Sequence, residues 1–173
     1  MTDYIFDQVQ RYRDRFRTTD PYALLDGMGV VVKRSNAFRS DGLRGYCTIM
    51  NRSRYVVING KQSEAEQRVV ASHEAGHLIL HKAQLKVGAL PDFDFYNTTS
   101  RLERQANLFA ADFLIDDEAV LDLVRTQDAD FFDVARQLCV PAPFLSFKLF
   151  SMVNRGFAMR LPADLNSTFL KSN

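Results

Sequence analysis

The chain has 173 residues, of which 46% are hydrophobic and 14 are phenylalanines, enough for the core of one compact domain. Its 22 basic and 21 acidic side chains nearly cancel, which excludes the strongly positive composition that nucleic-acid binding usually needs. No stretch approaches the ~20 apolar residues of a membrane span, and the charged N-terminus has no signal-peptide core. We therefore expect a single domain covering residues 1–173 and no membrane partner.

The first 60 residues predict two helices followed by a small sheet. Ile5 and Val9 recur at helical spacing between charged residues, which predicts an amphipathic helix over about 3–17. Asp20 before Pro21 is typical of an N-cap and predicts a second, short helix. Short β-branched runs predict three strands, mostly antiparallel, at Val30–Val32, Tyr46–Met50 and Tyr55–Ile58, with the last two joined as a hairpin.

The next predicted helix contains all three histidines of the protein. Ser63 and Glu66 have the spacing of a capping box, and the apolar pattern extends this helix to about Leu85. His73, Glu74 and His77 form an H-E-x-x-H motif within it. The helix should pack against the sheet.

The spacing of this motif suits a zinc site. Residues four apart lie on one face of a helix, so His73 and His77 can each present a ring nitrogen to the same zinc ion. Glu74, on the flank of that face, can act as the base that takes a proton from water, as in metallopeptidases. The alternative is a surface helix that carries two histidines by chance, and the scarcity of histidine in this chain favours the metal site.

A catalytic zinc ion needs a third protein ligand. His81 lies eight residues beyond His73, about 12 Å along a helix, too far to share a tetrahedral ion with it. A second helix, predicted from Ser100 to Ile115, has Glu103 and Asn107 on one face. Glu103 would be the third ligand and Asn107 would accept a hydrogen bond from a ligand histidine, although Ser100 and Glu103 also match a capping box.

The segment between these two helices is predicted to be an irregular loop beside the site, from Gln84 to Thr99. The chain has no further histidine to stabilise an oxyanion, so a tyrosine or a backbone amide must do so. Tyr96 is the candidate catalytic residue for this role, and the alternative is aromatic packing over Phe93 and Phe95.

The C-terminal third is predicted to be helical, in segments over about 117–125, 130–138 and 143–154, followed by an edge strand at 157–161 and a tail. Cys47 and Cys139, the only cysteines, lack metal or redox spacing and are expected to be buried and reduced, in keeping with a cytoplasmic protein. The predicted fold class is α+β, a small, mostly antiparallel three-stranded sheet packed against a helical bundle that carries the zinc motif. Its parts are the N-terminal helices and sheet (1–60), the metal helices (63–115), the C-terminal helices (117–155) and the tail (156–173).

The motifs together resemble those of the ImmA/IrrE-like metallopeptidases. The likeness runs through Tyr55–Asn59, Gln67–His81 and Glu103–Ala111. It implies a zinc endopeptidase of the gluzincin kind, with His73, His77 and Glu103 as ligands of Zn²⁺ and Glu74 as the catalytic base. It also implies a protein substrate, a helix-turn-helix repressor of a mobile element or a stress regulon. The chain departs from the family at 113–117, where a leucine-rich run ending in proline is common.

Two alternative functions remain at this point. The same three ligands would serve a zinc sensor without turnover. Residues 133–140 and the following helix loosely match a helix-turn-helix, which would make the protein a DNA-binding regulator. That helix, however, is mostly Phe, Leu and Met, with Lys148 as its only basic residue, which argues against direct nucleic-acid binding.

Overall fold

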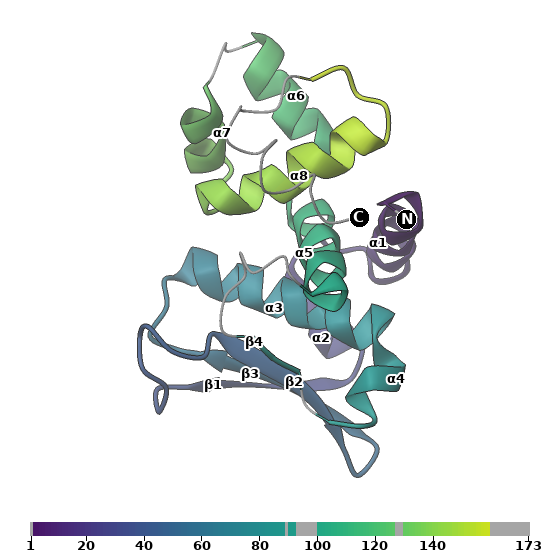
Figure 1. Cartoon of the computed structure of the whole chain (residues 1–173), viewed down its shortest axis with the longest axis vertical. Helices are drawn as coiled ribbons and strands as arrows, with labels where there is room; N and C mark the ends of the chain where they lie inside the picture. The colour runs from purple at the N-terminus through teal and green to yellow at the C-terminus, as the bar shows by residue number, and fades with distance from the viewer. Residues whose placement is uncertain (1, 89, 93–99, 127–129, 160–173) are drawn as a thin grey trace.

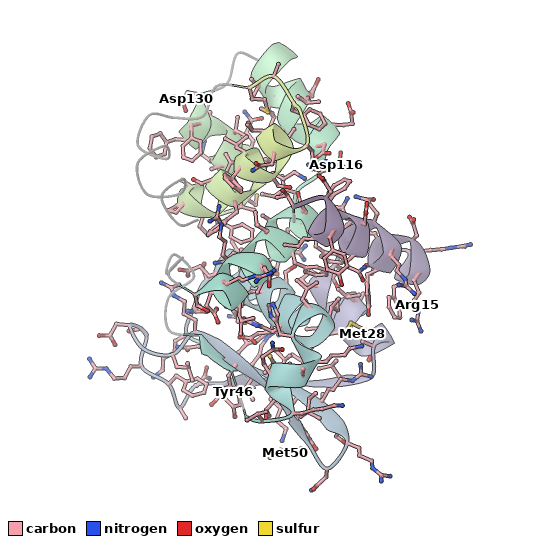
Figure 2. All side chains as sticks on the ribbon, turned by 45° about the vertical axis from the view of Figure 1, so that its right-hand side comes forward. Arg15, Met28, Tyr46, Met50, Asp116 and Asp130 are labelled. Atoms are coloured by element: carbon pink, nitrogen blue, oxygen red, sulfur yellow. The ribbon has the colours of Figure 1, made fainter. Side chains whose placement is uncertain are left out.

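The structure is a computed structural model that describes residues 2–88, 90–92, 100–126 and 130–159. Its sheet lies at one end, helices α6, α7 and α8 lie at the other, and α3 and α5 cross between them (Figure 1). In Figure 2 Tyr46 and Met50 mark the sheet end, whereas Asp116 and Asp130 mark the opposite end. No described helix is both long enough and apolar enough to cross a membrane.

The first two helices lie where the sequence predicts them. Helix α1 (Thr2–Phe16) buries Ile5 and Val9, the apolar positions at helical spacing. Helix α2 (Pro21–Gly27) begins after Asp20, whose carboxylate accepts a hydrogen bond from the backbone N–H of Ala23 at 3.1 Å. An N-cap carboxylate and a proline in the first turn therefore start this helix as expected.

The sheet has four strands in the order β1-β3-β2-β4, namely β1 (Val30–Ser35), β2 (Gly45–Met50), β3 (Ser53–Asn59) and β4 (Leu90–Asp92). Strand β1 runs parallel to β3, while β2 pairs antiparallel with both β3 and β4. The α+β class and the three predicted strands are confirmed. The short fourth strand was not predicted, because three residues in a Gly- and Pro-containing segment show no usable periodicity.

The hairpin between β2 and β3 is tighter than predicted. Asn51 and Arg52, with φ of 49° and 66°, form its turn. Two consecutive residues with positive φ are typical of a two-residue hairpin loop, whose twist matches that of the flanking strands. Strand β3 therefore begins at Ser53, inside the four-residue connection that the sequence predicted at 51–54.

Helix α3 (Glu64–Leu80) packs on the sheet, above the fully buried Val56 and Ile58 of β3. The predicted capping box is present, because Ser63 and Glu66 each accept a hydrogen bond from the other's backbone N–H. The predicted continuation to Leu85 is wrong. The helix stops at His81, with φ −120° and ψ 34°, and a separate turn, α4 (Lys82–Leu85), follows.

Helix α5 (Arg101–Leu114) crosses α3 at very short range. A Cβ atom added to Gly76 would lie 3.2 Å from the Cα and carbonyl oxygen of Ala106 and 3.3 Å from Cβ of Phe109. Glycine facing alanine thus permits a backbone approach that larger side chains would prevent. This contact sets how close the first turn of α5 comes to the histidines of α3.

The C-terminal helices are α6 (Asp117–Thr126), α7 (Phe131–Gln137) and α8 (Ala142–Asn154), close to the predicted ranges. Phe144, Phe147 and Met152 bury α8 in the core. Phe157–Met159, the described part of the predicted edge strand, is not in a strand.

The two cysteines differ in burial. Cys47 is buried as predicted, but the same prediction is wrong for Cys139, which is exposed with φ 53° in the turn before α8.

Four charged side chains form what we call the ion cluster between α5, α6 and α8: Asp112, Asp117, Lys148 and Arg155. Lys148 Nζ lies 3.0 Å from Asp112 and 2.6 Å from Asp117, and Arg155 donates two hydrogen bonds to Asp117 at 2.6 and 2.7 Å. The Lys148 side chain is only 1% exposed. Helix α8 therefore does not present its single basic residue for base recognition, which speaks against the DNA-binding interpretation.

Candidate metal centre

Three side chains from two helices converge between α3 and α5. His73 and His77 come from successive turns of α3, and Glu103 comes from the first turn of α5. Their potential ligand atoms all lie within 4.8 Å of one another. Glu103 Oε2 is 3.1 Å from His73 Nε2 and 3.4 Å from His77 Nε2, and the two Nε2 atoms are 3.0 Å apart. The structure thus brings together the three residues that the sequence suggested as ligands.

The capping-box alternative for Glu103 does not fit this geometry. Within the described part of the chain, the Ser100 side chain makes no capping hydrogen bond to α5. The Glu103 carboxylate instead faces the two buried histidine rings, with 22% of its side chain exposed. A partly open carboxylate beside two buried imidazoles is compatible with a centre that a substrate can reach.

Asn107, one turn after Glu103 on α5, contacts the far nitrogen of His73. Asn107 Oδ1 lies 2.8 Å from His73 Nδ1, and because an amide oxygen can only accept, His73 Nδ1 donates. The His73 ring then has its proton on Nδ1 and a lone pair on Nε2. That lone pair points toward His77 and Glu103, as a zinc ligand requires.

The protonation states of the group also suit a metal ion. Burial lowers the pKa of His77 to about 4. Burial by itself would raise the pKa of Glu103, but the close approach of His73 and His77 outweighs it and places that pKa well below its usual range. Near neutral pH the imidazole is therefore neutral and the carboxylate ionised, and two imidazoles with one carboxylate form a donor set that zinc binds. The residues present fit a zinc ion.

Glu74 is fully buried between α3 and strand β2. A Cβ atom added to Gly45 would lie 3.4 Å from Glu74 Oε1 and only 2.5 Å from Val70 Cγ1, so glycine leaves the space that this carboxylate occupies. Burial and then the nearby Glu74 charge raise the pKa of the Cys47 thiol, which therefore stays protonated beside the carboxylate. Neither Gly45 nor Cys47 carries a sequence signal for this role.

A second hydrogen-bonded chain leads away from His77. His77 Nδ1 lies 2.9 Å from His81 Nδ1, and His81 Nε2 lies 3.0 Å from Gln105 Oε1. His81 is thus not part of the ligand group, in keeping with the distance argument from the sequence. Gln105 was not predicted, because a glutamine two residues after Glu103 shows no pattern of its own. Tyr96 lies outside the described residues, so its role stays a prediction.

A small sheet, a helix with H-E-x-x-H and a second helix that contributes a glutamate define the class of gluzincin-type zinc metallopeptidases. Residues 26–150 match the IrrE N-terminal-like domain, and the chain belongs to this family of zinc metallopeptidases. This confirms the resemblance seen in the motifs. The chain is also 31% identical over 144 residues to "Uncharacterized immunity region protein 2" of Bacillus phage phi105, a match that covers 81% of this chain and 85% of the phage protein.

Proposed function

We propose that the protein is a zinc-dependent endopeptidase in which His73, His77 and Glu103 bind the metal ion. The observation that carries the proposal is the convergence of their ligand atoms within 4.8 Å, because three ligands of this kind leave one coordination position of a zinc ion for water or substrate. When bound, zinc supplies Lewis-acid activation of a water molecule and of the scissile carbonyl. Family membership supports the reaction class, and the side chains supply the rest of the chemistry.

Glu74 is the proposed catalytic base. It follows His73 directly on α3 and is fully buried beside β2, where Gly45 leaves room for its carboxylate. In this position Glu74 accepts the proton of the attacking water and delivers it to the leaving amine, which is the general acid–base work that peptide hydrolysis needs. Asn107 keeps the proton of His73 on Nδ1 throughout.

The proposed substrate is a helix-turn-helix repressor of the same mobile element or stress regulon. Two observations support it: the family consists of peptidases, which act on proteins, and one relative is an immunity region protein of a phage. A repressor acts in the cytoplasm, so we place the enzyme there. We also propose that residues 1–173 form one domain, since a continuous core extends from Ile5 to Met152.

The test measures zinc and cleavage in one set of proteins. The purified chain should bind one zinc ion and cleave the repressor encoded beside its gene. Glu74→Gln should retain the zinc and lose about 10²- to 10⁴-fold in cleavage rate. Glu64→Gln, at an exposed glutamate on the same helix, is the matched control and should cleave normally.

Each other outcome points to a specific alternative. Stoichiometric zinc without cleavage by the unaltered protein would favour the sensor. Retarded migration of operator DNA would favour the regulator. Full cleavage by Glu74→Gln would show that another group is the base.

A further inference from the structure

The hydrogen bonds between His77, His81 and Gln105 have only one consistent direction when they are followed inward from Gln105. Gln105 Oε1 can only accept, so the proton it receives at 3.0 Å is on His81 Nε2. In the neutral His81 imidazole the lone pair is then on Nδ1. That lone pair accepts from His77 Nδ1 at 2.9 Å.

The consequence for His77 is a defined tautomer. With its proton on Nδ1, the ring has a lone pair on Nε2, the atom that lies 3.0 Å from His73 Nε2 and 3.4 Å from Glu103 Oε2. The opposite direction would place a proton on His77 Nε2, where it would block coordination. Neutral histidine binds zinc through an unprotonated nitrogen, so the outer partner favours the tautomer of His77 that binds zinc.

The backbone places His81 for this contact. His81 ends α3 with φ −120° and ψ 34°, yet its backbone N–H still donates to His77 O at 2.9 Å. Its buried ring lies against that of His77, with centroids 4.9 Å apart. The break in the helix, which the apolar periodicity did not predict, therefore coincides with the residue that contacts the ligand.

We propose that His81 and Gln105 are positioning residues that keep His77 in its zinc-binding tautomer, an inference that rests on the proposed metal site. Helix α5 then supplies three functions in succession: Glu103 binds the metal, Gln105 orients His77 through His81, and Asn107 orients His73 directly. The rings of both ligand histidines depend on amide oxygens of the helix that also contributes the third ligand. The packing of α5 on α3 thus brings all of these groups together.

The experiment compares two substitutions at one position by zinc affinity, measured by competition with a chelator. His81→Leu removes the acceptor and should weaken zinc binding by roughly ten- to a hundredfold, the usual cost of losing such an outer partner. His81→Asn keeps an acceptor, because an asparagine Oδ1 occupies the place of a histidine Nδ1, and should bind zinc nearly as tightly as the unaltered chain. Thermal unfolding of the zinc-free proteins shows whether each variant is folded.

Two further readouts separate positioning from packing. Asn107→Ala, which removes the corresponding partner of His73, should weaken zinc by a similar factor. Long-range ¹H–¹⁵N spectra of the zinc-loaded protein should show His77 protonated on Nδ1 and His81 on Nε2. In Gln105→Leu the His81 proton is no longer fixed on Nε2, and we expect a smaller loss of affinity than in His81→Leu.

The outcomes distinguish this inference from the proposed function. If His81→Leu binds zinc as tightly as the unaltered chain while Glu103→Ala binds none, the metal site stands and the positioning role is wrong. Equal weakening by His81→Leu and His81→Asn would also overturn it, because packing rather than the acceptor would then matter. If the unaltered chain binds no zinc, both proposals fail.

Discussion

Helix α5 contributes to two buried polar clusters that differ in how their charges are balanced. Near its start, Glu103 meets His73 and His77, one carboxylate with two imidazoles. Near its end, Asp112 belongs to the ion cluster, in which two carboxylates meet Lys148 and Arg155. Both clusters lie among apolar side chains, where an unbalanced charge is costly.

The difference explains what each cluster does. In the ion cluster, two positive and two negative side chains compensate one another, and Ser151 donates a further hydrogen bond to Asp112 at 2.6 Å. That cluster is complete within the protein and fastens α6 and α8 to α5. At the other end, the lone pairs of two imidazoles and a carboxylate converge, and the carboxylate charge favours a cation. The ion cluster therefore stabilises the packing of the helices, whereas the ligand atoms of the histidine and glutamate group are arranged to bind a metal ion.

The largest expected effect is the loss of the metal ion on Glu103→Ala. Removing one of three ligands should take zinc from one ion per chain to an undetectable level, because two imidazoles retain too little affinity. The Glu103→Ala variant should unfold at nearly the same temperature as the unaltered chain stripped of zinc, because zinc bound to the folded state would itself raise that temperature. Metal analysis after dialysis measures the zinc content per chain, and calorimetry measures the unfolding temperature. Retained stoichiometric zinc would contradict the ligand assignment.

For Asp112→Ala we expect the opposite pattern, a loss of stability with zinc binding retained. Lys148 would lose a partner while remaining buried, so the free energy of unfolding should fall by roughly 3–5 kcal/mol. Zinc affinity of the folded protein should be unchanged. The control is the double variant Asp112→Leu with Lys148→Met, which removes both charges and should restore much of the stability. Urea denaturation measures each value, and equal instability of the single and double variants would contradict the ion-pair explanation.

A smaller effect that links both properties is expected for Gly76→Ala. The added methyl group would press on Ala106 at 3.2 Å and should cost roughly 1–3 kcal/mol by overpacking, partly offset by the higher helix propensity of alanine. Because α5 must shift, Glu103 moves relative to the histidines and zinc affinity should also fall. Gly88→Ala is the control, since a Cβ there meets nothing within 4 Å among the described residues. A Gly76→Ala protein with normal zinc affinity would show that the crossing tolerates the shift.

The smallest effect appears in acid. Burial alone would raise the pKa of Asp117, but hydrogen bonds from Arg155 and Lys148 lower it from 3.8 to about 2. Because the pKa is lower in the folded state, this stabilisation is fully present above about pH 4 and is lost as the pH falls toward 2. Asp117→Asn should remove this part of the pH dependence. Unfolding free energies measured across that range would contradict the assignment if the variant and the unaltered chain fell in parallel.

Local spacing was enough to predict most elements and the candidate ligands. Helical periodicity placed His73 and His77 on one face and paired Glu103 with Asn107, because residues four apart always share a helix face. Capping residues predicted the starts of α2 and α3, because a cap and the backbone N–H group that it contacts lie within one turn of each other. They left Glu103 with two interpretations, ligand or cap, since both require the same spacing.

The tertiary structure decided what depends on contacts between elements. The close crossing of Gly76 and Ala106 directs Glu103 toward the histidines and away from a capping role. In the structure α3 ends at His81, the His81 ring lies between His77 and Gln105, and Cys139 is exposed, none of which local spacing predicted. A helical repeat contains no information about how two helices approach each other, because that distance is set by side-chain size where they meet. By itself the sequence thus determined which residues share a face, and only the packing of α5 on α3 decided which faces meet.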